Sequence, residues 1–108
     1  MVKTKERAKD GLEVKAIGIN DFVTINDDSE IVEAHVVKEI NGAVATIYSL
    51  GITAEKDDMV IVEKMVALNK LIHIDSSFVS VNSILWQIRE KLLRGENIQT
   101  YNFIKIVV

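Results

Sequence analysis

The chain of 108 residues contains no cysteine and no proline. The absence of cysteine excludes disulfide bonds, thiolate catalysis and zinc sites with sulfur ligands. The absence of proline removes a residue that commonly blocks pairing at the edge of a β-sheet. An exposed edge strand must then be protected by charge, by coverage or by pairing with another chain, which favours self-association.

Long apolar runs and chemical motifs are missing as well. No run approaches the about 20 apolar residues of a membrane span, and no signal-peptide pattern opens the chain, so we expect a cytoplasmic protein without membrane contact. The five glycines are isolated and form no phosphate-binding loop. The two histidines, His35 and His73, lie singly among apolar neighbours, as core histidines do. The sequence therefore predicts no catalytic residue, no cofactor and no metal site, and an enzyme is the less favoured class.

The composition is that of one globular domain, since 48% of the residues are hydrophobic and 27% are charged. Residues 1–10 contain four basic and two acidic side chains, a net charge of +2, whereas residues 11–108 carry −5. We interpret residues 1–10 as a flexible basic arm and residues 11–108 as a single α+β domain. The acidic body disfavours broad binding to nucleic-acid phosphates, although the arm could contact an anionic partner.

The strongest local signal is Asn41-Gly42 between two apolar runs, residues 31–40 and 43–52. Both loop positions of a type I′ turn need a positive φ, which glycine adopts freely and asparagine tolerates, so the pattern predicts an antiparallel hairpin. The alternative is one helix over residues 27–50, because Asp27 and Glu30 resemble a capping box. Gly42 would cost that helix about 1 kcal/mol relative to alanine, and β-branched residues crowd positions 43–48.

Other segments extend the predicted sheet. Alternation over residues 12–19 and an apolar run at 22–25 predict two strands. Residues 59–63 predict another strand, followed by a helical segment over 65–73; the alternative is one helix from residue 59 to about residue 72. The β-prone residues 98–108 predict a final strand at the C-terminus. The predicted fold is α+β, a mainly antiparallel β-meander of five to six strands packed on one long C-terminal helix.

That helix is predicted over residues 77–94, with the N-cap at Asp75-Ser76-Ser77 and the end at Gly95. One apolar stripe should cover the sheet; it comprises Phe78, Val81, Leu85, Ile88 and Leu92, with Ile84 beside it.

A second stripe combines Val79, Trp86 and Leu93 with the neighbouring Arg89. Trp86 could pack under a loop, but tryptophan and arginine are also enriched where proteins bind one another. We therefore predict a non-catalytic protein–protein interaction or assembly module that contacts itself or another protein. The contact would use Val79, Trp86, Arg89 and Leu93, or alternatively the open edge of the final strand.

Two other functional classes stay open at this point. A nucleic-acid-associated protein would use the basic arm and the strand aromatics Tyr48, Tyr101 and Phe103. A cation-dependent protein would use the acidic clusters at 27–30 and 55–58, although neither has the spacing of an EF-hand loop.

Overall fold

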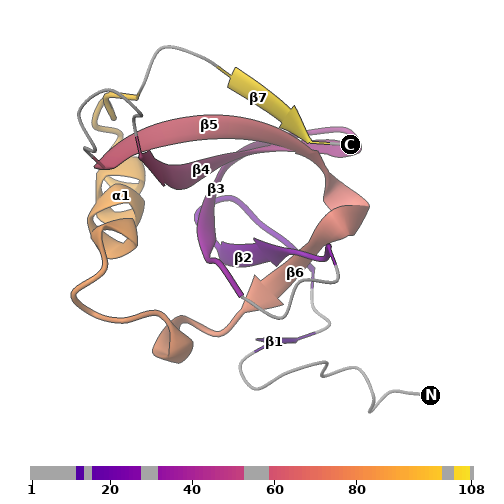
Figure 1. The fold of residues 1–108 in the computed structure, drawn as a ribbon, viewed down its shortest axis with the longest axis horizontal. Coiled ribbons are helices and arrows are strands. Elements are labelled where there is room, and N and C mark those ends of the chain that lie inside the picture. The colour runs from indigo at the N-terminus through magenta and orange to yellow at the C-terminus, as the bar shows by residue number, and fades with distance from the viewer. Residues whose placement is uncertain (1–11, 14–15, 28–31, 53–58, 101–103, 108) are drawn as a thin grey trace.

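The computed structural model describes residues 12–13, 16–27, 32–52, 59–100 and 104–107. In this part of the chain, one sheet has neighbouring strands in the order β1 (Leu12–Glu13), β6 (Leu71–Ile74), β2 (Phe22–Ile25), β3 (His35–Asn41), β4 (Val44–Ile52), β5 (Met59–Ala67) and β7 (Ile104–Val107). The one α-helix of these residues, α1 (Ile84–Leu93), packs against the sheet (Figure 1). The class is therefore α+β with a mainly antiparallel sheet, as predicted. The predicted basic arm, residues 1–10, lies outside the described residues. In the described part of the chain, no helix has the length and apolar character needed to cross a membrane.

The predicted hairpin is confirmed, and the single helix over residues 27–50 is wrong. Strand β3 (His35–Asn41) pairs antiparallel with β4 (Val44–Ile52), and Asn41 lies opposite Val44. The loop is thus Gly42-Ala43 rather than Asn41-Gly42, one residue later than predicted. Gly42 has φ +60°, whereas Asn41 and Ala43 have negative φ, so the turn follows the type II′ pattern with glycine first.

The helical segment predicted over residues 65–73 is wrong, because β5 (Met59–Ala67) covers its first residues and β6 (Leu71–Ile74) covers its last ones. All nine residues of β5 pair with β4, from Val44 opposite Ala67 to Ile52 opposite Met59. This long-range pairing outweighs the local helix propensity. A short 3₁₀ turn, η2 (Leu68–Lys70), then leads into β6 (Leu71–Ile74).

The sheet is strongly curved because β5 and β6 are adjacent in sequence but distant in strand order. β6 pairs antiparallel with β2 (Phe22–Ile25), which also pairs with β3. Only the three residues of η2 separate the end of β5 from the start of β6. The ribbon from β2 to β5 must therefore curl back on itself, as Figure 1 shows.

The outer strands are shorter than predicted. β1 covers Leu12–Glu13 and pairs with β6. A strand was predicted over residues 12–19, of which 14–15 lie outside the described residues and 16–19 are not in a strand. β7 covers Ile104–Val107 and runs parallel to β5, whereas the prediction was a strand over residues 98–108. Residues 98–100 are outside any strand, and residues 101–103 and 108 lie outside the described residues. Counting β1, the described residues form a sheet of seven strands, whereas five or six were predicted.

Helix α1 covers Ile84–Leu93, ten residues, so the long helix predicted over residues 77–94 is wrong. Asp75 caps a 3₁₀ turn, η3 (Ser76–Phe78), instead of the α-helix. The true N-cap is Ser83, whose side chain accepts a hydrogen bond from the backbone N–H of Leu85. Serine and asparagine at positions 80, 82 and 83 form local bonds that compete with a helix. The predicted end is confirmed, since Gly95 has φ +71° after Arg94.

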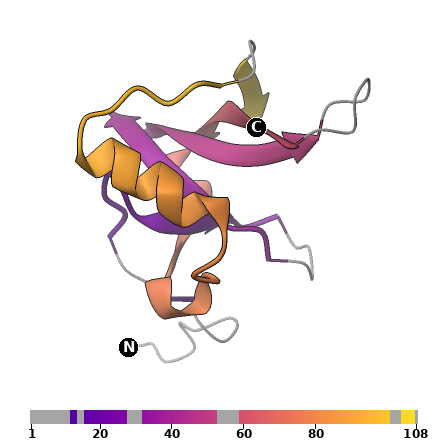
Figure 2. The ribbon, with the colours of Figure 1, turned by 90° about the vertical axis from the view of Figure 1, so that its left-hand side faces the viewer.

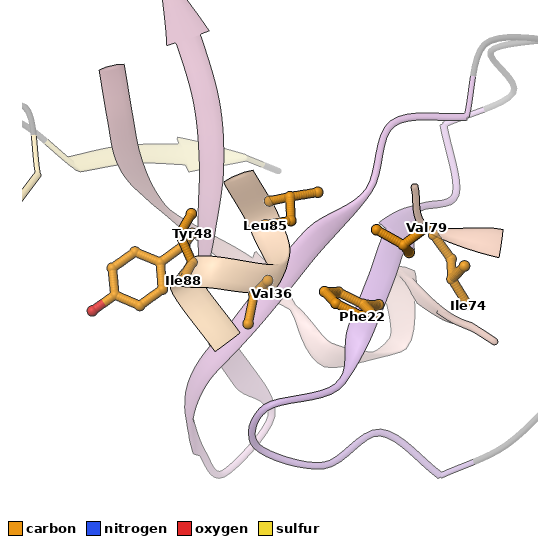
Figure 3. Close-up of a cluster of buried hydrophobic side chains, with 7 residues drawn as sticks. All are labelled: Phe22, Val36, Tyr48, Ile74, Val79, Leu85 and Ile88. Carbon is orange, nitrogen blue, oxygen red and sulfur yellow. The ribbon is translucent and has the colours of Figure 1, made fainter. Parts of the chain in front are cut away.

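The buried side chains form two clusters that alternate along the strands. Phe22, Val36 and Tyr48 belong to the cluster under α1, whereas their neighbours Val23, Val37 and Ile47 belong to the other. This alternation places the two clusters on opposite faces of the sheet. Figure 2 shows α1 lying across one face. Figure 3 shows the cluster beneath it, which comprises Phe22, Val36, Tyr48, Ile74, Val79, Leu85 and Ile88.

Two members of the predicted sheet-covering stripe lie elsewhere. Leu85 and Ile88 are buried as predicted, and Leu92 packs partly against the same cluster. Phe78 is 58% exposed and Val81 is 81% exposed. Both precede α1 in the chain, so the helical spacing that grouped them with Leu85 does not apply to them.

Candidate functional site

A cavity of about 240 Å³ opens where the start of β2, the end of β6, η3 and α1 meet. We call it the α1 cleft. Its lining is mostly polar and comprises Asp21, Phe22, His73, Ile74, Asp75, Ser76 and Arg89. The cleft therefore brings a guanidinium, two carboxylates, an imidazole and a hydroxyl group close together.

Strand pairing brings these residues together from distant parts of the chain. Val23 in β2 lies opposite His73 in β6, so the start of β2 meets the end of β6. Asp75 and Ser76 follow β6 directly and enter η3. Arg89 comes from the middle of α1, which packs on this face of the sheet.

Asp21 is held in a fixed position at the edge of the cleft. Its Oδ2 atom accepts a hydrogen bond of 2.7 Å from the backbone N–H of Gly18, and Asp21 N–H donates to the Gly18 carbonyl at 3.2 Å. Asn20 adopts φ +76° within this turn, a conformation that asparagine tolerates better than most residues. The same Oδ2 atom lies 3.8 Å from Nε2 of His73. The carboxylate is thus positioned by the backbone and faces the imidazole.

Arg89 is held by aromatic rings rather than by a carboxylate. Its guanidinium lies 5.0 Å from the ring centre of Phe22 and 5.5 Å from that of Trp86. Among the residues that the structure describes, Arg89 makes no hydrogen bond and no ion pair. A positioned guanidinium whose donors are unused is suited to bind a carboxylate from another molecule.

Trp86 lies beside Arg89 and packs against the core. Its ring meets Phe22 edge to face, with the centroids 5.0 Å apart and an interplanar angle of 73°. Its Nε1–H donates a 3.0 Å hydrogen bond to the carbonyl of Val79. Trp86 therefore fastens the segment before α1 to the helix and packs against the core, which is the alternative that the sequence left open for it.

The four residues predicted as an interface differ in burial, although Trp86 contacts both Val79 and Arg89. Val79 is buried in the core, and Trp86 is half-buried beside it. Arg89 lines the α1 cleft, whereas Leu93 is 61% exposed near the end of α1. Sequence reasoning missed the cleft residues Asp21, His73, Asp75 and Ser76. His73 was predicted as a core histidine and Asp75 and Ser76 as N-cap residues, and no local pattern shows that β2 pairs with β6.

His35 is a core histidine, as predicted. It is buried in β3, and its Nδ1 lies 2.7 Å from Oγ of the buried Ser49. Burial, assisted by the positive charge of Lys64, lowers the pKa of His35 from 6.5 to about 4, although Asp27 opposes the change. His35 is therefore neutral at pH 7 and serves the packing of the sheet.

Polar side chains of β3, β4 and β5 form a second cluster, in which Lys38, Tyr48 and Glu63 interact with one another. Lys38 Nζ donates to Glu63 Oε2 at 3.1 Å and lies 5.7 Å from the centre of the Tyr48 ring. Burial is the main cause that raises the pKa of Tyr48. Burial alone would lower the pKa of Lys38, but the hydrogen bond to Glu63 and the nearby charges outweigh it, so the pKa of Lys38 is raised. Because Tyr48 is buried, it offers no exposed ring for stacking a nucleic-acid base.

The other predicted candidates fall partly outside the described residues. Tyr101 and Phe103, and the acidic side chains at 28, 30, 55, 57 and 58, belong to segments that the structure does not describe. Within the described ranges, no group of three or more histidine, aspartate and glutamate side chains could hold a metal ion. The α1 cleft is thus the site with the most chemistry in the described part of the chain.

Comparisons of the chain with protein-family models, with curated proteins and with solved structures find no match. The function must therefore be argued from the residues of the cleft. Their charges and hydrogen-bonding groups suit the recognition of charged groups on another molecule.

Proposed function

We propose that the protein is a non-catalytic interaction module that associates with a second copy of itself through the α1 cleft and the neighbouring Phe78 and Val81. The observation that carries this proposal is Arg89, which lies over two aromatic rings and makes no ion pair among the described residues. Arginine and tryptophan together are typical of the residues that contribute most to protein–protein binding.

The charges of the cleft favour a second copy as the partner. Arg89 provides one positive charge, and Asp21 and Asp75 provide two negative charges around the same cavity. In a two-fold contact, each copy presents the same surface to the other, so Arg89 of one copy can meet a carboxylate of its partner twice. A patch that carries both signs is complementary to itself.

Two exposed apolar side chains follow the cleft residue Ser76 closely in the chain. Phe78 is 58% exposed and Val81 is 81% exposed. The bond from Trp86 to the Val79 carbonyl places this segment against α1, and Ser76 from the same segment lines the cleft. An apolar area bordered by polar groups is typical of a contact surface.

The test is native mass by light scattering over a range of protein concentrations. We expect the wild type to form dimers and Arg89→Glu to be monomeric, with unchanged circular dichroism. Lys91→Glu is the matched control, because it makes the same charge change on an exposed position of the same helix. Phe78→Ser should also weaken the dimer, and it alters an exposed side chain that the fold does not bury.

A wild type that stays monomeric at the highest concentration would refute self-association. Equal dimerisation of Arg89→Glu and Lys91→Glu would place the contact elsewhere. Trp86 is a poorer probe than Arg89, since its ring packs on Phe22 and its replacement by glutamate would damage the core.

A further inference from the structure

We infer that the α1 cleft also binds a small zwitterion of the amino-acid class, with the carboxylate at Arg89 and the ammonium group at Asp21 and Asp75. The inference rests on the same cleft as the proposed function but does not require a dimer. It adds a ligand class to a surface for which self-association alone is proposed above.

The size of the cleft limits the ligand. Its volume of about 240 Å³ is below the range of about 300–1,000 Å³ that is typical of sites for larger organic molecules. Such sites are mostly apolar, whereas this lining is mostly polar, with buried Phe22 and Ile74 as its apolar residues. A compact ligand with charged groups fits both properties.

The signs of the lining charges select the ligand further. A simple anion such as phosphate is attracted by Arg89 but repelled by Asp21 and Asp75. A simple amine is attracted by Asp21 and Asp75 but repelled by Arg89. Only a ligand that carries both charges can pair favourably with Arg89 and with both aspartates. A ligand with one charge binds more weakly, because a group of the same sign in the cleft repels it.

The binding groups are already in position. Phe22 and Trp86 hold the guanidinium of Arg89, and the N–H of Gly18 holds the carboxylate of Asp21. The hydroxyl of Ser76 makes no hydrogen bond among the described residues, so it is available to a ligand carboxylate. Groups that are fixed before binding lose little conformational freedom on binding.

The experiment uses the fluorescence of Trp86, which is the only tryptophan of the chain and lies beside Arg89. The full chain, dilute enough to be monomeric by light scattering, is titrated with glycine, L-alanine and L-glutamate. Acetate, methylammonium and inorganic phosphate are titrated in parallel. We expect a saturable change with at least one amino acid, and binding at least about tenfold weaker for each single-charge compound and for phosphate.

Three variants assign the binding to the cleft. Arg89→Gln should weaken amino-acid binding about tenfold or more, and Lys91→Gln should leave it unchanged. Asp75→Asn keeps the oxygen that caps η3 but removes the charge, so it should reduce the preference for the amino acid over acetate. A purely structural role of Asp75 would not change that ratio.

Several results would overturn the inference. They are the absence of a saturable change up to about 50 mM amino acid, equal or tighter binding of acetate or phosphate, and unchanged binding by Arg89→Gln. Because the titration uses monomeric protein, its failure is separate from a failure of self-association. A monomeric wild type that still binds the amino acid would refute only the proposed function.

Discussion

Acidification should destabilise the protein through His35 before most carboxylates are protonated. In the folded state, the pKa of His35 is lowered to about 4, whereas an unfolded histidine titrates near 6.5. The unfolded chain therefore binds more protons between these two pH values. The stability that neutral His35 provides is complete above about pH 6.5 and is lost as the pH falls toward about 4.

The pKa difference sets the size of this effect. Because the pKa of His35 is about 4 in the folded state and about 6.5 in the unfolded state, the free energy of unfolding falls by about 3 kcal/mol once His35 is protonated in both states. At about pH 5 the loss is about 2 kcal/mol. His35 is almost wholly buried, so little solvent screening reduces these values. The cost arises because a charged imidazole would be buried beside Ser49 with the positive Lys64 nearby.

Urea unfolding of the wild type and of His35→Gln at about pH 7.5, 6 and 5 measures the effect. Glutamine is neutral at every pH and keeps an amide that can bond Ser49. We expect the wild type to lose about 2 kcal/mol more than the variant between about pH 7.5 and 5, since the carboxylates titrate alike in both proteins. Parallel pH profiles of the two proteins, or a His35 ring that titrates above pH 6 by NMR, would show that burial of His35 does not cause the loss of stability.

Three further predictions concern stability and are checked by urea unfolding at neutral pH. Trp86→Ala should lower the free energy of unfolding by about 2–4 kcal/mol, and Trp86→Phe by about 1 kcal/mol. Phenylalanine keeps most of the packing on Phe22 but not the hydrogen bond to Val79, so similar losses in the two variants would contradict this packing. Gly42→Ala should cost about 1 kcal/mol because Gly42 has φ +60°, whereas Gly51→Ala, whose new methyl group would meet its neighbours at ordinary contact distances, should cost less. Ser83→Ala should cost about 1 kcal/mol by removing the N-cap of α1, and an unchanged stability would show that the cap contributes little.

Local signals in the sequence identified the hairpin and the end of the helix. Gly42 and Gly95 both adopt positive φ, and glycine between periodic segments is the residue that marks such positions. The register of the turn was less well determined, because glycine can occupy the second position of a type I′ turn or the first of a type II′ turn. The start of α1 was misplaced because Asp75 and Ser83 are both suitable N-caps.

Long-range pairing explains what the sequence did not reveal. Residues 65–67 have good helix formers around them, but pairing with β4 keeps them in a strand. The cleft depends on the pairing of β2 with β6, which brings Asp21 near His73 although about fifty residues separate them. Arg89 was identified from its helical spacing to Trp86, but its carboxylate neighbours required the fold.

We propose that the α1 cleft is the surface through which this protein recognises its partner, and NMR can locate that surface residue by residue. Amide chemical shifts of the full chain are followed as the protein concentration is raised from dilute to self-associating conditions. We expect the amide shifts that change with concentration to be those of Asp21, of His73 to Phe78 and of the helical turn around Arg89. Movement confined to the hairpin tip at Gly42 or to β7, or no movement at any concentration, would contradict it.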